Sequence, residues 1–162
     1  MKIKIIIGVV VVAIIAVAAF VVAGDGTSPN AAELEKMRGT EGYYADSEMM
    51  VAVDPMGVPN LIANCADAPR IAKIAFDIQY KLGKEWLKTP EKATEALSKH
   101  AVEIRSAMIL LIASKKSTQI ITGGNAITFL EEVRRMINEI VFPKQMARVE
   151  RVLIKELIVQ GG

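Results

Sequence analysis

The side chains that could carry chemistry in this 162-residue chain are few and lie far apart. His100 is the only histidine and Cys65 is the only cysteine. One imidazole and one thiol cannot complete a zinc site, and no carboxylate-rich loop resembles a calcium site. We interpret His100 as a histidine held by a hydrogen bond, with a general base as the functional alternative. Cys65 is interpreted as a small core residue, with a reactive thiol as the alternative.

Two further patterns could form a site. Gly123-Gly124 before Asn125 could bind a phosphate through free backbone amides, but the pair lacks the lysine and the spacing of a P-loop. No serine stands in a nucleophile elbow. We therefore predict no catalytic residue, no metal site and no cofactor. The chain is expected not to be an enzyme and to have no small-molecule substrate.

The strands that must position these residues follow from short apolar segments. Residues 49–53 and 58–64 are apolar and flank Asp54-Pro55-Met56-Gly57, which has the residue preferences of a type I turn. Residues 70–80 alternate between apolar and polar side chains, which predicts a half-buried strand. These three segments are interpreted as an antiparallel β-meander. Residues 151–160 are predicted to form a closing C-terminal strand, because the segment is short and β-branched.

Two long helices are predicted between these strands, over residues 90–114 and 125–142, with a short helical turn at 117–122. Thr89 is expected to cap the first helix, with Pro90 at its first helical position, and Asn125 is expected to cap the second. The predicted buried stripes are Ala93, Leu97, His100, Ile104, Met108 and Leu111 on the first helix, and Ile127, Leu130, Val133, Ile137 and Val141 on the second. The fold class is therefore predicted to be α+β.

A charged cluster on the second helix is the candidate contact surface. It consists of Glu131, Glu132, Arg134 and Arg135. The simplest interpretation is a solvated helix face, because exposed ion pairs contribute little to stability. The functional alternative is a contact with another subunit or with a partner protein.

The N-terminus contains an unbroken apolar run of nineteen residues that is predicted to be a membrane anchor. The run extends over residues 5–23 and includes Ile5, Val12, Ala19 and Ala23. As a helix it would span about 28 Å, close to the hydrocarbon thickness of a bilayer of about 30 Å. It contains no ionisable residue, so we expect an anchor and not a proton path. A cleavable signal peptide is the alternative, although its apolar region is usually shorter.

The charges beside the run predict its orientation. Lys2 and Lys4 precede it, so the positive-inside rule places the tail, residues 1–4, in the cytoplasm. The rest of the chain is then exported, as a linker over residues 24–46 and one domain over residues 47–162. Without Lys2 and Lys4, the 20 basic and 18 acidic residues of the chain become 18 of each sign. Such a balanced surface does not favour nucleic acid, and a single cysteine allows no intramolecular disulfide.

The order of these features resembles the FliL family of flagellar basal-body-associated proteins. The similar features are the short tail, span and tether, the Pro59-Asn60-Leu61 strand, the alternating strand after Arg70, and His100 to Arg105 leading into the apolar run 108–113. Residues 126–138, which end in Ile137-Asn138, and the closing Leu157-Ile158-Val159-Gln160 are also similar to the family's pattern. Trp86 and the polar stretch 88–92 match no shared pattern.

The resemblance implies an inner-membrane protein at the flagellar basal body whose periplasmic domain is similar in fold to stomatin-like (SPFH) domains. It further implies a homo-oligomeric ring that surrounds the MotA/MotB stator and supports its engagement, torque and motility. Two alternatives stay open. One is a stomatin-like membrane scaffold unrelated to motility, and the other is an exported ligand-binding domain that uses His100 or the Gly123-Gly124 loop.

Overall fold

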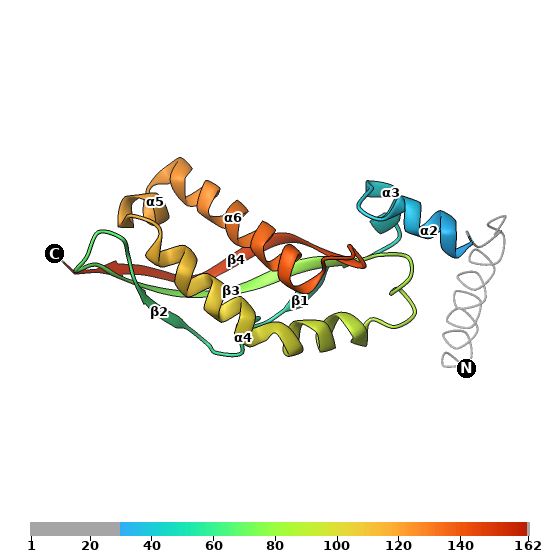
Figure 1. Ribbon diagram of the computed structural model, residues 1–162, viewed down its shortest axis with the longest axis horizontal. Coiled ribbons are helices and arrows are strands. Elements are labelled where there is room, and N and C mark those ends of the chain that lie inside the picture. Colours follow the sequence, from blue (N-terminus) through green and yellow to red (C-terminus); the bar gives the residue numbers. More distant parts are fainter. Residues whose placement is uncertain (1–29, 162) are drawn as a thin grey trace, which may run out of the picture. The chain divides into compact units, whose positions relative to one another are not determined.

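The computed structural model describes residues 30–161, and the α+β class is confirmed within them. The helices and strands are, in chain order, α2 (Ala31–Met37), α3 (Glu41–Tyr44), β1 (Met50–Ala52), β2 (Leu61–Asn64), β3 (Ile71–Leu82), α4 (Glu91–Ala113), α5 (Ser117–Ile121), α6 (Gly123–Val141) and β4 (Ala147–Gln160) (Figure 1). Residues from Glu33 onward belong to one compact unit.

The sheet is built around β3, which pairs antiparallel with every other strand. β4 follows β3 along its whole length, from Ile71 opposite Gln160 to Leu82 opposite Ala147. On the other edge of β3, β2 pairs with residues 71–74 and β1 pairs with residues 78–80. Because β3 is much longer than β1 or β2, these two strands lie end to end along the same edge.

The predicted β-meander is therefore wrong in one pairing. β2 and β3 form the expected neighbouring pair, but β1 pairs with β3 and not with β2. The predicted turn is present, since Gly57 N–H donates to Asp54 C=O at 2.8 Å. It joins two strands that continue along one edge instead of reversing beside each other. The closing strand also begins earlier than predicted, at Ala147.

The core lies between one face of the sheet and the helices. Alternate β3 side chains, the even-numbered residues from Ala72 to Leu82, are buried. α4 packs over β2 and α6 over β4, and Figure 1 shows both helices running along the sheet. The odd-numbered residues of β3 point to the opposite face, which these helices do not cover. The alternation predicted for this strand is confirmed.

The helix caps differ from the predictions by one residue on α4 and by three residues on α6. Pro90 is the N-cap residue of α4, so Thr89 lies one position too early to cap it. Thr89 Oγ1 is buried and has no hydrogen-bond partner among residues 30–161. α6 begins at Gly123 with Thr122 as its N-cap residue. Asn125 is therefore inside the helix, and its side chain donates to Thr118 C=O at 3.3 Å.

The buried stripes also differ from the predicted ones. On α4, Ile112 is fully buried, whereas His100 and Leu111 are only half-buried. On α6, Phe129 is buried and Ile127 is 67% exposed, because the buried positions recur every four residues through Val141. Ile127 lies two residues before that series, which turns it to the other side of the helix.

No helix between residues 30 and 161 combines the length and the apolar composition needed to cross a membrane. The predicted tail, residues 1–4, and the predicted anchor, residues 5–23, lie outside the described residues. The predicted linker, residues 24–46, includes α2 and α3 in its described part.

Candidate functional site on helix α6

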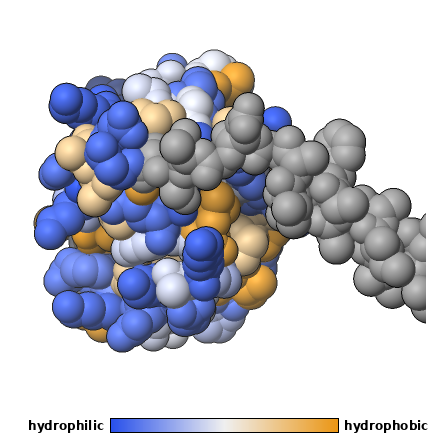
Figure 2. Space-filling view, turned by 90° about the vertical axis from the view of Figure 1, so that its right-hand side faces the viewer, coloured by the Kyte–Doolittle hydropathy of each residue, from blue (hydrophilic) through white to orange (hydrophobic). Residues whose placement is uncertain are grey.

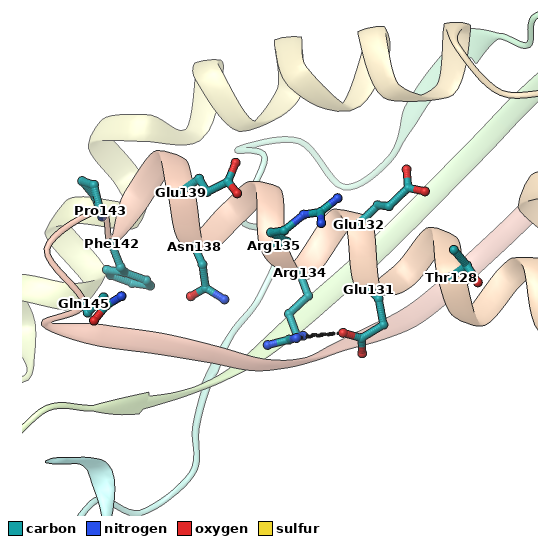
Figure 3. A pocket seen from close by; sticks show the side chains of 10 residues that line it. All are labelled: Thr128, Glu131, Glu132, Arg134, Arg135, Asn138, Glu139, Phe142, Pro143 and Gln145. Carbon is teal, nitrogen blue, oxygen red and sulfur yellow. Dashed lines mark hydrogen bonds and ion pairs between the residues drawn. The ribbon is translucent and has the colours of Figure 1, made fainter. Parts of the chain in front are cut away.

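A hollow of about 600 Å³ runs along the outer surface of α6 (Figure 3). It is lined by Thr128, Glu131, Glu132, Arg134, Arg135, Asn138, Glu139, Phe142, Pro143 and Gln145. Most of these residues recur at steps of three or four, which places them along one side of the helix. All four charged residues that the sequence singled out line this hollow. The structure therefore brings them together in one concave surface.

Three of the four charged residues are held by partners within the domain. Arg134 pairs with Glu131 on the same helix, with Nη2 2.8 Å from Oε2. Glu132 pairs with Lys115, whose Nζ lies 2.7 Å from Oε2, just beyond the C-terminal end of α4. The second pair links α6 to the end of α4. Both pairs are partly exposed, so their contribution to stability is small.

The remaining charges are free to meet a partner. Arg135 and Glu139 are exposed and form no ion pair with any residue between 30 and 161. They stand one turn apart on α6, and both line the hollow. A guanidinium and a carboxylate at this spacing offer one donor group and one acceptor group to another protein.

Asn138 connects this surface to the free edge of β4. Its side chain accepts from Val149 N–H at 2.7 Å and donates to Val149 C=O at 3.1 Å. Both backbone groups of Val149 therefore point away from β3, toward the edge that no described strand covers. Asn138 occupies these two groups as a neighbouring strand would. An edge strand with unpaired backbone groups invites pairing with other chains, and this contact closes it at one position.

The sequence reasoning missed the role of Asn138. Ile137-Asn138 was singled out only as a resemblance. A usable signal was present, because Asn138 is an uncharged amide directly beside the buried stripe residue Ile137. Such a position favours a side chain that bonds to backbone. Its partner lies 11 residues away on another element, so periodicity alone could not identify it.

A second polar cluster attaches α2 and α3 to the sheet end, and we call Arg38, Tyr43, Tyr44 and Glu85 the clasp. The Arg38 guanidinium donates to both Glu85 oxygens at 2.9 and 3.0 Å, and Tyr43 O–H donates to Glu85 Oε2 at 2.6 Å. Tyr44 O–H donates to Gln145 C=O at 2.6 Å. Both tyrosines are almost fully buried. They belong to the core of the domain, although they fall inside the predicted linker.

The clasp shifts the acidity of its members. The hydrogen bond from Arg38, followed by that from Tyr43, lowers the pKa of Glu85. Burial, followed by the hydrogen bond to Glu85, raises the pKa of Tyr43 to about 12. Glu85 is therefore held ionised and Tyr43 is held protonated at neutral pH, as the clasp requires.

The end of the domain that carries the clasp has a mostly hydrophilic surface. Figure 2 views this end, where hydrophobic residues form small separate patches between hydrophilic side chains. Arg148 stacks here over the Tyr44 ring, with Cζ 4.5 Å from the ring centroid, and pairs with Glu41 and Glu150. This arrangement adds a cation–π contact to the hydrogen bonds of the clasp.

The residues that the sequence considered for chemistry lie apart from each other. His100 is half-buried on α4 and shares a hydrogen bond with Glu103, with Nδ1 2.7 Å from Oε2. Cys65 is buried, and burial raises the pKa of its thiol. Gly123 and Gly124 are exposed at the start of α6. Among residues 30–161, no three histidine, cysteine, aspartate or glutamate side chains lie close enough to hold a metal ion.

Comparison with known families gives a match that covers the sheet and the long helices. The family described as "Flagellar basal body-associated protein FliL" matches residues 50–160. This segment runs from β1 to the end of β4, so it includes the whole sheet and the α6 surface. No curated protein sequence matches the chain.

Proposed function

Since this chain belongs to the FliL family of flagellar basal body-associated proteins, we propose that it is a membrane-anchored scaffold that binds the MotA/MotB stator. The chain is an accessory protein of the flagellar basal body. In the proposal, a span at residues 5–23 holds the domain in the periplasm beside the inner membrane. Several copies form a ring around the periplasmic part of the stator, and the domain is similar in fold to stomatin-like (SPFH) domains.

The family match over residues 50–160 is the observation that carries this proposal. The α6 surface supports it, because its exposed charges are available to protein partners, the stator and the next copy in the ring. Glu131 and Arg134 form a partly exposed pair, and Arg135 and Glu139 have no ion-pair partner among the described residues. A concave surface with charges of both signs fits a protein partner better than an anionic lipid surface or nucleic acid, which favour positive charge alone. The proposed role is binding, without catalysis.

The proposed mechanism is a shift between stator conformations. Copies confined to one membrane have a high effective concentration, so weak contacts between them suffice to close a ring. If the ring binds the extended conformation of the stator more tightly than the other conformation, binding increases the population of the extended one. The size of the shift is set by the ratio of the two affinities. The stator then carries the protons, and this protein holds it in place.

The test exchanges the charges of one ion pair on the α6 surface. In the double variant Glu131→Arg with Arg134→Glu, the two side chains can still pair three residues apart. The pattern of charge offered to a partner is inverted. We expect the full-length variant to lose co-purification with stator subunits and to reduce swimming in soft agar. Its unfolding free energy should stay within about 0.5 kcal/mol of the wild type, since the pair is a surface pair.

A matched control reverses two exposed charges on α4, in the double variant Glu95→Lys with Lys99→Glu. This variant should keep both stator binding and motility. Normal stator recovery with the α6 exchange would refute the assignment of this surface. A deletion strain whose flagella assemble and rotate normally under high load would instead support a scaffold unrelated to motility.

A further inference from the structure

The face of the sheet turned away from the helices carries an uncovered apolar hollow. Ile62 and Ile158 both stand opposite Lys73 in the strand register, so all three share this face. Ile62 is 62% exposed, Ile71 is 42% exposed and Ile158 is 38% exposed. Together with Gln160 these residues line a hollow of about 240 Å³. An apolar cavity of about 150 Å³ already holds benzene, so this hollow can accept a branched aliphatic side chain.

The helix layer carries a second uncovered apolar surface on the opposite side of the domain. Residues 107–113 of α4 are apolar on every side of the helix, which is typical of a helix covered all round. Met108 and Ile112 face the core, but Leu110 is 71% exposed and Ile109 is 42% exposed. Leu110 borders a groove between α4 and α6 that is also lined by Ala107, Leu111, Met136, Glu132, Arg135 and Glu139.

The charges beside these two surfaces complement each other. The groove beside Leu110 carries Arg135 and Glu139, which have no ion-pair partner between residues 30 and 161. The hollow on the sheet is flanked by Lys73, which pairs with Glu156 at 2.8 Å. If the surfaces meet, Glu139 can approach Lys73 and Arg135 can approach Glu156. Each charge beside the groove then faces a charge of opposite sign beside the hollow on the sheet.

We propose that the helix face of one copy packs on the bare sheet face of a second copy, with Leu110 inserted between Ile62, Ile71 and Ile158. The inference deepens the ring assembly proposed above and rests on it. An antiparallel sheet can leave one face in water, but the exposed aliphatic residues of this face would be buried if the neighbour's helices packed on them. A two-fold contact between two helix faces would leave both sheet faces uncovered.

The proposed contact joins two different surfaces, so it repeats from copy to copy. Such a head-to-tail contact generates a ring when the rotation closes and a filament when it does not. A stacking of helix face on sheet face can keep β3 pointing the same way in every copy. The α2 and α3 ends then all lie on one side, as copies anchored in one membrane require.

The experiment uses the full-length chain with one new cysteine per variant and a short bismaleimide cross-linker. Cys65 is the only native cysteine and is 4% exposed, so it reacts poorly. A mixture of the Leu110→Cys and Ile62→Cys variants should cross-link into dimers, whereas each variant alone should not. Ile127→Cys is the matched control, because Ile127 is 67% exposed but lies outside both surfaces. Its mixture with Ile62→Cys should stay uncross-linked.

Arginine variants test the same contact without a reagent. Leu110→Arg and Ile62→Arg should each weaken self-association by about 10- to 100-fold, since each removes one buried aliphatic side chain from the contact. Mixing the two should restore a 1:1 complex, because Leu110→Arg keeps an intact sheet face and Ile62→Arg keeps an intact helix face. Circular dichroism of each variant checks that the fold is kept.

Several outcomes would overturn the proposal. Self-cross-linking of Leu110→Cys alone would indicate a two-fold contact of helix faces. An oligomer that forms without any cross-link in the mixture would place the contact elsewhere, and a monomeric full-length protein would refute both this contact and the ring. Cross-linking in the mixture together with failure to recover stator subunits would support the contact and refute only the proposed stator binding.

Discussion

Replacing Asn138 by alanine should destabilise the domain through the backbone of Val149. Val149 is fully buried, and both its N–H and its C=O bond to the Asn138 side chain. A buried polar group that loses its partner costs about 1–3 kcal/mol. Asn138 itself is half-buried, so water can replace part of the loss. We therefore expect Asn138→Ala to lower the unfolding free energy by about 2–3 kcal/mol.

Thermal unfolding of the full-length chain, followed by circular dichroism, measures this change. For a domain of this size, about 1 kcal/mol corresponds to a shift of about 3–4 °C, so the midpoint should fall by about 6–12 °C. Glu139→Ala, at the next residue, is exposed and should shift it by less than about 2 °C. Asn138→Asp keeps the acceptor but loses the donor at neutral pH. Its defect should shrink as the pH falls and the introduced carboxyl group gains a proton.

A midpoint for Asn138→Ala within about 2 °C of the wild type would refute this reasoning. It would mean that water satisfies the backbone of Val149 as well as the amide does. Closure of the β4 edge would then not depend on this side chain. A rise in light scattering for Asn138→Ala, without one for Glu139→Ala, would show that the opened edge promotes aggregation.

Four further predictions concern the clasp and the helix surface. Gly83→Ala should destabilise the domain by about 1–3 kcal/mol in urea unfolding, because a Cβ there would overlap the Tyr43 ring and lie 2.8 Å from Met146 C=O. The folded state lowers the pKa of Glu85, so ionised Glu85 stabilises the fold above its unfolded pKa, and this stabilisation is lost as the pH falls through its folded pKa. The Glu85→Gln variant has no carboxyl group to protonate, so its stability should fall less with acid in unfolding scans than that of the wild type. The folded state raises the pKa of Tyr43 to about 12, so protonated Tyr43 stabilises the fold below its unfolded pKa of about 10, and this stabilisation is lost as the pH rises toward 12. The Tyr43→Phe variant should therefore lack one late step in an ultraviolet titration of the tyrosines. Ile127→Arg should change the unfolding free energy by less than about 0.5 kcal/mol, because Ile127 is 67% exposed.

The elements that the sequence predicted well are those whose two faces meet different surroundings. β3 alternates because helices cover one of its faces and not the other, so its period of two is visible in the residues themselves. The order of the strands in the sheet could not be predicted from the residues in the same way. β1 pairs with β3 and not with β2, because that choice depends on the unequal lengths of strands that are separated in the chain. Ile127 was assigned to the core because an apolar residue at helical spacing does not reveal which side of the helix faces the sheet.

The candidate surface on α6 was recognised in part. The sequence predicts a charged cluster of Glu131, Glu132, Arg134 and Arg135, and all four residues line the hollow along α6. The clasp could not be found in this way, because Arg38 and Glu85 are 47 residues apart and only the folded chain brings them together. Contacts of this kind depend on tertiary packing, which local periodicity does not encode.

The position of the clasp determines how a mechanical force would enter the domain. Glu85 follows the end of β3, and Gln145 precedes the start of β4, so α3 grips the same end of both long strands. Tension applied through α2 along the strand axis would load both strands together. Because β3 and β4 are paired over the whole length of β3 and are held at the same end, this load would move the two strands together and would not separate their hydrogen-bonded pairs. The domain can therefore resist a pull on its N-terminal segment without unzipping its sheet.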